Sequence, residues 1–240
     1  MSNPVKTAMI LAAGHGLRMR PLTITTPKPL IKVGGRALLD HAIDRVKAIG
    51  VTDIIVNVHH LAEQVIAHCK ARKDVAITIQ DEREAILDTG GALVRARPFF
   101  KDEPFLIFNS DSLWVEGMGN NLRRLFAAWD NSQMDCLMLL AAMWNTIGES
   151  GRGDFMLDQL GRVTRREPQR VTPFVFPGVQ IMHPRLLDAA PKEPFSTNFL
   201  WDHAIEKGRL FGVRLDGRWM HVGTPEALHD AEDYLAEIGA

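Results

Sequence analysis

The amino-acid sequence predicts an α/β protein built on a doubly wound, mixed and mainly parallel sheet flanked by helices. Two observations support this prediction. Short apolar runs alternate with helical patterns of about a dozen residues through the first half of the chain, which is how parallel strands are joined by crossover helices. The first run, TAMILAA at 7–13, is apolar at almost every position, as expected of a strand that is covered on both faces.

The elements of the first half follow in order. A helix is predicted over 37–50, where Leu38, Ala42 and Val46 lie on one apolar stripe and Gly50 ends the helix. The remaining elements of this half are strands at 54–58, 75–79 and 105–108 and a helix at 61–72.

Ligands bind outside the carboxyl ends of the strands in such sheets. The loops that follow the predicted strands are therefore expected to converge on one crevice. These loops contain Gly14, the segment 82–91 and the segment 109–111.

The second half is less regular. Helices are predicted at 120–130, near 197–207 and after Thr224-Pro225, where Thr is a good N-cap and Pro a good first helical residue. A strand is predicted at 135–142, two β-like stretches meet at Gln159–Gly161, and a further apolar run covers 174–182. Since no repeat or low-complexity linker interrupts the chain, residues 1–240 are interpreted as a single domain.

The composition of the chain argues against several classes of binding partner. The 28 basic and 29 acidic side chains give a net charge of −1, which argues against a nucleic-acid partner. No run approaches the roughly 20 apolar residues that span a bilayer, so we expect no membrane partner and a soluble, cytoplasmic protein. Cys69 and Cys136 have no ligand-like spacing and are interpreted as buried free thiols. The sequence leaves open whether the chain is a monomer or a dimer.

The loop after the first strand reads ILAAGHGLRMRPLTITTPKPL over 10–30. Gly14 and Gly16 let backbone N–H groups approach anionic oxygens, while Arg18 and Lys28 add positive charge. The loop is neither a Walker motif nor a dinucleotide fingerprint, because Met19 stands where the latter needs its third glycine. It predicts a phosphate site of another kind, and a pyridine-nucleotide dehydrogenase is disfavoured.

The segment AMILAAGHGLRMRPLTITTPKPL resembles the signature of the sugar-1-phosphate nucleotidylyltransferases: an apolar strand, Leu-Ala-Ala-Gly, a Gly-x-x-x-Arg turn, Pro-Leu-Thr and Pro-Lys-Pro. Further landmarks of that family follow in order, namely DTGGAL at 88–93, FNSD at 108–111 and a Trp-x-x-x-Gly-Thr segment at 219–224. The resemblance spans nearly the whole chain and weakens between about 115 and 215. It implies a Rossmann-like, GT-A-like nucleotidyltransferase fold.

The resemblance also implies the reaction, in which a sugar 1-phosphate attacks the α-phosphorus of a nucleoside triphosphate and pyrophosphate leaves. Residues 1–112 would form the nucleotide-binding half and residues 113–240 the sugar-binding half. Arg18, Lys28 and Asp111 would be the catalytic residues. The other nucleotide-binding residues would be Leu11, Ala12, Ala13, Gly14, Gly16, Glu82, Thr89, Gly90, Gly91 and Asn109.

Asp111 ends the apolar strand FLIFNSD, where its carboxylate would point out of the sheet edge. Mg²⁺ prefers one or two carboxylates together with substrate oxygens and waters. Asp111 is therefore expected to bind Mg²⁺. The reaction needs no Ser or Cys nucleophile, because a sugar phosphate is already anionic near neutral pH and the barrier consists mostly of charge repulsion and alignment.

One segment of the second half bears on the identity of the substrates. GRGDF at 151–155 resembles the corresponding segment of the N-acetylmuramate-1-phosphate uridylyltransferases of cell-wall recycling, which implies UTP and N-acetylmuramate 1-phosphate as substrates. The sugar-binding residues would then be Gly153, Asp154, Glu167 and Gly178. A mannose-1-phosphate guanylyltransferase and a non-catalytic nucleotide- or sugar-binding module on the same fold remain alternatives.

His221 departs from the family pattern, which usually has Asp at that position to complete the metal site. Histidine is a poorer ligand for Mg²⁺, which favours hard oxygen donors. Three interpretations are open. His221 binds a borderline metal such as Mn²⁺ or Co²⁺, it holds a metal-bound water or a phosphate oxygen, or the enzyme is weak or inactive.

The family resemblance predicts the effect of restoring the carboxylate. His221→Asp should preserve or raise Mg²⁺-dependent activity, since it returns a hard oxygen donor to the metal site. The rate of pyrophosphate release at varied Mg²⁺ measures this effect. Complete loss of activity in a folded variant would count against the assignment of His221 to the metal site.

Overall fold

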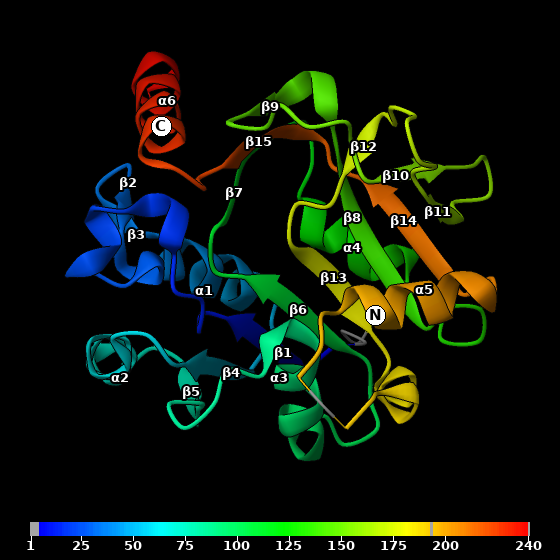
Figure 1. Cartoon of the computed structure of the whole chain (residues 1–240), viewed down its shortest axis with the longest axis horizontal. Helices are drawn as coiled ribbons and strands as arrows, with labels where there is room; N and C mark the ends of the chain where they lie inside the picture. The colour runs from blue at the N-terminus through cyan, green and yellow to red at the C-terminus, as the bar shows by residue number, and fades with distance from the viewer. Residues whose placement is uncertain (1–4, 193, 240) are drawn as a thin grey trace.

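The structure, a computed structural model, describes residues 5–192 and 194–239. A ten-stranded sheet runs through the molecule in the order β11-β10-β12-β8-β13-β6-β1-β4-β5, with β14 paired to β8 (Figure 1). The parallel part comes from the first half of the chain. It consists of β1 (Thr7–Leu11), β4 (Asp53–Val58), β5 (Ala76–Asp81) and β6 (Phe105–Asn109).

The second half extends this sheet in mixed directions. Strand β13 (Val179–Met182) runs antiparallel between β6 and β8 (Cys136–Ala142), and β14 (Leu210–Arg214) runs parallel to β8. The predicted β-like stretches form an antiparallel hairpin of β10 and β11, which joins the sheet through β12. These strands are Phe155–Leu157, Val163–Arg165 and Phe174–Val175.

Six α-helices are described. Helix α1 (Leu38–Ala48) buries the predicted stripe, including Leu38, Ala42 and Val46. Helix α6 (Pro225–Ile238) begins as expected, because the Thr224 side chain accepts a hydrogen bond from the Ala227 N–H at 3.1 Å. The others are α2 (Ala62–Ala71), α3 (Asp88–Ala96), α4 (Asn121–Ala128) and α5 (Asn198–Glu206).

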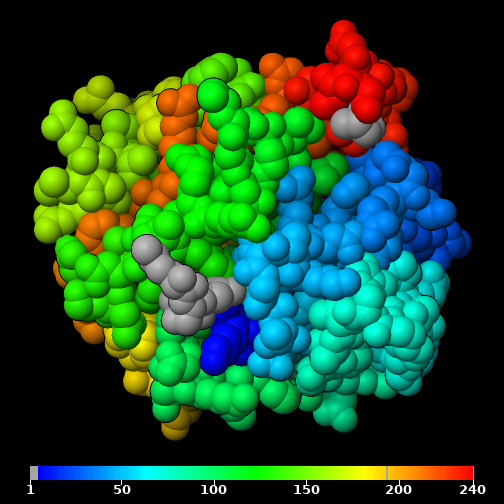
Figure 2. All heavy atoms as spheres, turned by 180° about the vertical axis from the view of Figure 1, so that it is seen from behind, coloured from blue at the N-terminus to red at the C-terminus, as the bar shows by residue number. Residues whose placement is uncertain are grey.

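Apolar clusters cover the two faces of the main sheet, and a third cluster, which includes Leu113, Met220 and Ala231, lies under α6. Of the two on the main sheet, one includes Ile10, Val56 and Leu139 under α1, α2 and α4, and the other includes Met9, Phe105 and Met138 under α3 and α5. Seen from behind, the red C-terminal segment lies against the early blue segment (Figure 2). That contact includes the Glu232 carboxylate, which accepts from the Gly34 N–H at 3.0 Å.

Two predicted strand limits need correction. The strand predicted over 7–13 ends at Leu11, because the Ala12 N–H donates to the Asn57 side chain at 2.7 Å instead of to a neighbouring strand. The run predicted over 174–182 is two strands, since Pro177 and Gly178 interrupt it and Gly178 has a φ of +87°.

A three-stranded sheet that the sequence did not predict lies beside the main one. It orders β7 (Ser112–Glu116), β15 (Gly217–His221) and β9 (Thr146–Ile147), with β15 in the middle. In the β7–β15 register His221 faces Ser112. This pairing brings the end of β15 next to Asp111, across more than a hundred residues of sequence.

Candidate active site

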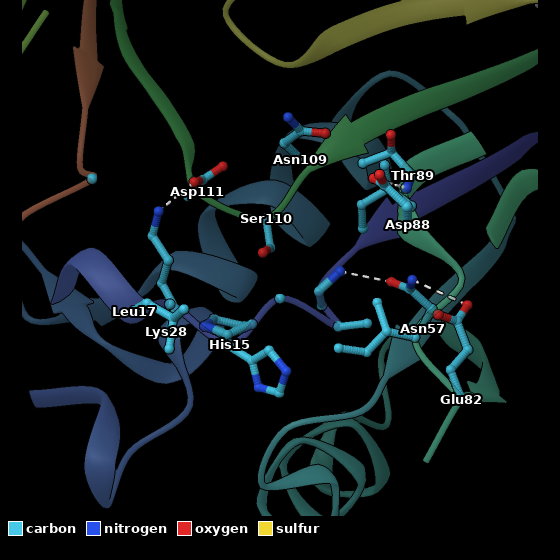
Figure 3. Close-up of a pocket in the computed structure, with 18 of the residues that line it drawn as sticks. His15, Leu17, Lys28, Asn57, Glu82, Asp88, Thr89, Asn109, Ser110 and Asp111 are labelled. Carbon is cyan, nitrogen blue, oxygen red and sulfur yellow. Dashed lines mark hydrogen bonds and ion pairs between the residues drawn. The ribbon is translucent and has the colours of Figure 1, made fainter. Parts of the chain in front are cut away.

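A cavity of about 520 Å³ opens at the carboxyl ends of β1, β4, β5 and β6 (Figure 3). Figure 3 shows Lys28 and Asp111 on one side of the cavity and Asn57 and Glu82 on the other. The crevice expected from the strand order is therefore present, as the general rule for ligand sites in α/β sheets requires. The predicted residues that line it are Leu11, Ala12, Ala13, Gly14, Gly16, Arg18, Lys28, Glu82, Thr89, Asn109 and Asp111.

The glycine loop turns back on itself at Gly16. Its φ is +61°, and a Cβ there would lie only 2.9 Å from Thr23 Cγ2 and 3.1 Å from Lys28 Cβ, so a larger residue would push the loop apart. The Gly16 carbonyl accepts from the Thr23 hydroxyl at 2.8 Å. Gly16 thus lets the loop pack tightly against Thr23 and Lys28.

Gly14 has a different environment. A Cβ at this position would meet no atom of the described residues within 4 Å, and Gly14 lines the cavity. The backbone is open to a ligand there, which fits the expected approach of phosphate oxygens to its N–H group.

Lys28 and Asp111 form an ion pair with 2.5 Å between Lys28 Nζ and Asp111 Oδ2. Lys28 follows Pro27 at the start of a short 3₁₀ turn, Lys28–Leu30, and Asp111 lies between β6 and β7. Removal from water is the largest influence on the pKa of Asp111 and raises it, but the charge and hydrogen bond of Lys28 outweigh it, so the pKa lies below its ordinary value. Asp111 is therefore ionised at neutral pH and available to a cation.

His221 lies at the same end of the cavity. Its Nε2 is 3.5 Å from Arg18 Nη2, and its Nδ1 is 3.0 Å from Glu149 Oε2. Glu149 carries no motif that would single it out in the sequence. It follows a strand of only two residues, and only the pairing of that strand with β15 brings it to His221.

The opposite end of the cavity is built around a buried carboxylate. Glu82 is 2% exposed and accepts from Gln80 Nε2 at 2.6 Å and from Asn57 Nδ2 at 3.2 Å. Burial is the main influence on the pKa of Glu82, which is raised. Asn57, which the sequence did not single out, also anchors Ala12 and so connects the glycine loop to this end.

The DTGGAL segment forms the start of α3, and its first glycine packs against a distant part of the chain. A Cβ at Gly90 would lie 2.4 Å from the Phe195 ring, and the Gly90 N–H donates to the Phe195 carbonyl at 2.8 Å. At Gly91 the space is less tight, since a Cβ there would lie 3.1 Å from Leu87 Cβ and 3.7 Å from Pro194 Cα. Neither glycine is among the residues that line the cavity, and Gly90 allows Phe195 to pack against the start of α3.

The predicted sugar-side residues are not brought together around the cavity. A Cβ at Gly153 would lie 2.2 Å from the Thr172 carbonyl oxygen, and Asp154 accepts from the Phe176 N–H at 3.1 Å. Glu167 is exposed and 3.8 Å from Arg170 Nε. Gly178 alone of the four touches a lining residue, since a Cβ there would lie 2.7 Å from Asn109 Cβ.

Other candidate groups take structural positions. His59 Nδ1 lies 2.7 Å from the Glu82 carbonyl oxygen, and His60 Nε2 lies 3.0 Å from the Thr23 carbonyl oxygen. Cys69 and Cys136 are buried and free. Burial raises the pKa of the Cys69 thiol to about 11, so it is a poor nucleophile at neutral pH.

Within residues 5–192 and 194–239, no three His, Cys, Asp or Glu side chains form a closed metal-binding group. Asp111 and His221 offer one carboxylate and one imidazole nitrogen beside the glycine loop. This open donor set fits a divalent cation that takes its remaining ligands from substrate oxygens and water. In the described part of the chain, no helix has the length and apolar character to cross a membrane.

One cavity thus combines a glycine loop, two cationic side chains, a carboxylate just after a strand and a second polar end. The family described as nucleotidyl transferase matches residues 7–238, and the chain belongs to that family. This confirms the family suggested by the sequence resemblance.

Two related proteins are also sugar-1-phosphate nucleotidyltransferases. N-acetylmuramate alpha-1-phosphate uridylyltransferase of Caulobacter vibrioides is 42% identical over 241 residues, covering 99% of this chain and 100% of that protein. Mannose-1-phosphate guanyltransferase of Candida albicans is 29% identical over 229 residues, which are 91% of this chain and 61% of that protein.

The fold is shared with solved structures. The inositol-1-phosphate CTP transferase of T. maritima superposes with a TM-score of 0.76 at 15% identity, covering 99% of this chain and 98% of that one. The predicted nucleotidyltransferase fold, with its mixed sheet flanked by helices, is therefore confirmed.

The raised pKa of Glu82 predicts a pH-dependent stability difference. A native pKa above the ordinary 4.5 means that the native state binds more protons than the unfolded state, so this group's contribution falls as the pH rises above 4.5. Glu82→Gln removes that titration. Its free energy of unfolding relative to wild type should rise from pH 4 upward and then level off, as measured by urea unfolding. A pH-independent difference would contradict the assignment.

Proposed function

We propose that this enzyme transfers a uridylyl group from UTP to N-acetylmuramate 1-phosphate and releases pyrophosphate. The observation that carries the proposal is the Lys28–Asp111 pair beside Arg18 in a cavity at the strand ends. Such a site joins positive charge for a triphosphate with a carboxylate for a cation. Through its product, a nucleotide-activated amino sugar acid, the proposal assigns the chain to cytoplasmic cell-wall recycling.

The proposed reaction is a single displacement. A phosphate oxygen of the sugar 1-phosphate forms a bond to the α-phosphorus as the bond to the bridging oxygen of pyrophosphate breaks. The attacking oxygen is already anionic, so the chain need not remove a proton. Its tasks are to align two anions and to offset their repulsion.

Each cationic residue has a distinct place in this scheme. Arg18, with its planar fork, is suited to clamp the leaving phosphates from the exposed rim of the loop. Lys28 is 14% exposed, and a compact ammonium held away from water stabilises charge that develops at the α-phosphate. The open backbone at Gly14 would receive phosphate oxygens directly.

We further propose that Asp111 and His221 hold Mg²⁺, with Mn²⁺ or Co²⁺ as alternatives suited to an imidazole ligand. When bound, such a cation supplies positive charge to the phosphate oxygens of both substrates. Lys28 would then exchange its contact with Asp111 for a contact with a phosphate oxygen, because the Asp111 carboxylate would bind the metal instead of the lysine.

Support for the sugar and the base comes from the relatives. The uridylyltransferase of Caulobacter vibrioides aligns over its whole length, whereas this chain spans only 61% of the Candida albicans guanyltransferase. Glu82 and Thr89 at the far end of the cavity are proposed to face the base and ribose, and the Asn109–Gly178 contact marks the proposed entry of the sugar. GTP with mannose 1-phosphate is the second candidate.

A substrate panel tests the proposal. Pyrophosphate release should be fastest with UTP and N-acetylmuramate 1-phosphate among UTP and GTP paired with several sugar 1-phosphates, and it should require a divalent metal. Lys28→Ala should lower kcat/KM by roughly 10²–10³-fold, the usual loss for one charge-stabilising donor.

Lys32→Ala provides the matched control, because Lys32 is an exposed lysine nearby in the chain and should leave the rate unchanged. Preference for GTP and mannose 1-phosphate would support the second candidate. If no pair is turned over while UTP still raises the melting temperature, the chain is a binding module and the proposed activity is wrong.

A further inference from the structure

Glu149 contacts the metal-site histidine from a strand that the sequence did not predict. Strand β9 pairs in parallel with β15, with Ile147 opposite Met220, so the next residues of the two strands continue side by side. A Cβ at Gly148 would lie 2.6 Å from the His221 carbonyl oxygen, which shows how closely the two chains approach. Glu149 follows, with its Oε2 at 3.0 Å from His221 Nδ1.

Both carboxylate oxygens of Glu149 are held in place. Oε1 accepts from the Gly151 N–H at 2.8 Å, and Oε2 contacts the imidazole. The side chain is 19% exposed and that of His221 is 21% exposed. This carboxylate is therefore fixed by its own loop and directed at one ring nitrogen.

The imidazole ring is fixed from other sides as well. Trp219 stacks on it with ring centres 5.3 Å apart and an interplanar angle of 11°. A Cβ at Gly223 would lie 2.8 Å from His221 Nε2, and Gly223 lines the cavity. The absence of a side chain at Gly223 thus leaves Nε2 open to the cavity.

The partners of the two ring nitrogens determine which one carries the proton in a neutral ring. A carboxylate only accepts, so Nδ1 must be the donor toward Glu149. A guanidinium only donates, so Nε2 must be the acceptor toward Arg18, at 3.5 Å. Both contacts require the same tautomer, with hydrogen on Nδ1 and a lone pair on Nε2.

We propose that Glu149 is a positioning residue that holds His221 as the Nδ1–H tautomer and presents the Nε2 lone pair, beside Asp111, to a divalent cation. The inference rests on the proposed metal-dependent function. A carboxylate behind a metal-binding histidine fixes the ring and makes the nitrogen a better donor. Glu149 thereby allows His221 to bind a cation at a position where the family resemblance expects an aspartate.

The tautomer can be observed directly in the full-length ¹⁵N-labelled protein by long-range proton–nitrogen correlation of the histidine rings, with His221 assigned from His221→Asp. Wild-type His221 should show a protonated Nδ1 and an unprotonated Nε2. Mn²⁺ alone should broaden the His221 signals. In Glu149→Ala the Nδ1–H form should decrease, and equal broadening should need roughly 10-fold more Mn²⁺.

Two variants serve as controls. Glu149→Gln keeps an acceptor oxygen and should largely retain the tautomer. Asp233→Ala removes a carboxylate that lies 3.4 Å from the exposed His229 and should change neither the His221 signals nor their response to Mn²⁺. A protonated Nε2 in wild type, or a Glu149→Ala spectrum and Mn²⁺ response identical to wild type, would overturn the proposal.

The route of the effect is tested in a His221→Asp background, where no imidazole remains to be oriented. Adding Glu149→Ala there should not weaken Mn²⁺ binding, measured from the loss of the free Mn²⁺ resonance. If it weakens binding as strongly as in wild type, Glu149 acts on the metal independently and the positioning role is wrong. Lack of turnover with every substrate pair would refute the proposed function, while these binding and spectroscopic results would still decide the inference.

Discussion

The ion pair between Lys28 and Asp111 is the contact on which the organisation of this site depends. The lysine comes from the loop that follows β1, and the aspartate lies just after β6, the strand that pairs with β1. Gly16 allows the loop to pack against Thr23 and Lys28, and prolines on both sides of Lys28 restrict its backbone. The two charges neutralise one another at the cavity wall. In the proposed reaction each exchanges its partner, the lysine for a phosphate and the carboxylate for a cation.

The rest of the cavity follows from the geometry of parallel strands. Four different strands end at the cavity, with Leu11, Asn57, Glu82 and Asn109 at or next to their ends. The register of the parallel sheet is enough to bring these residues together. The cavity consequently has two chemically different ends. The cationic side chains and the ionised Asp111 carboxylate lie at one end. The buried, hydrogen-bonded carboxylate of Glu82, whose pKa is raised, lies at the other end. This polarity suits an elongated ligand with a highly charged phosphate end and a nearly neutral base.

Sequence patterns predicted this half of the molecule well because its signals are local. Apolar periodicity located α1 and the parallel strands, and the glycine loop with Arg18 and Lys28 indicated phosphate chemistry before any contact was known. The other half depends on contacts between segments far apart in the chain. Strands β7, β9 and β15 are short and have no distinctive alternation, so neither their sheet nor the meeting of Glu149 with His221 could be predicted. The close approach of Phe195 to Gly90 is a further contact of this kind, because the sequence does not indicate which distant side chain packs against a glycine.

The proposed site aligns two anions and supplies charge, while both cysteine thiols are buried away from the cavity. Nucleotidyl transfer should therefore occur in one direct displacement, without a covalent enzyme intermediate. The most direct measurement uses a single diastereomer of UTP that carries sulfur on the α-phosphorus, with the configuration of the sugar-nucleotide product read by phosphorus NMR. One in-line displacement predicts inversion at the α-phosphorus. Retention would require two displacements through a covalent intermediate and would contradict the proposed role of the Lys28–Asp111 site.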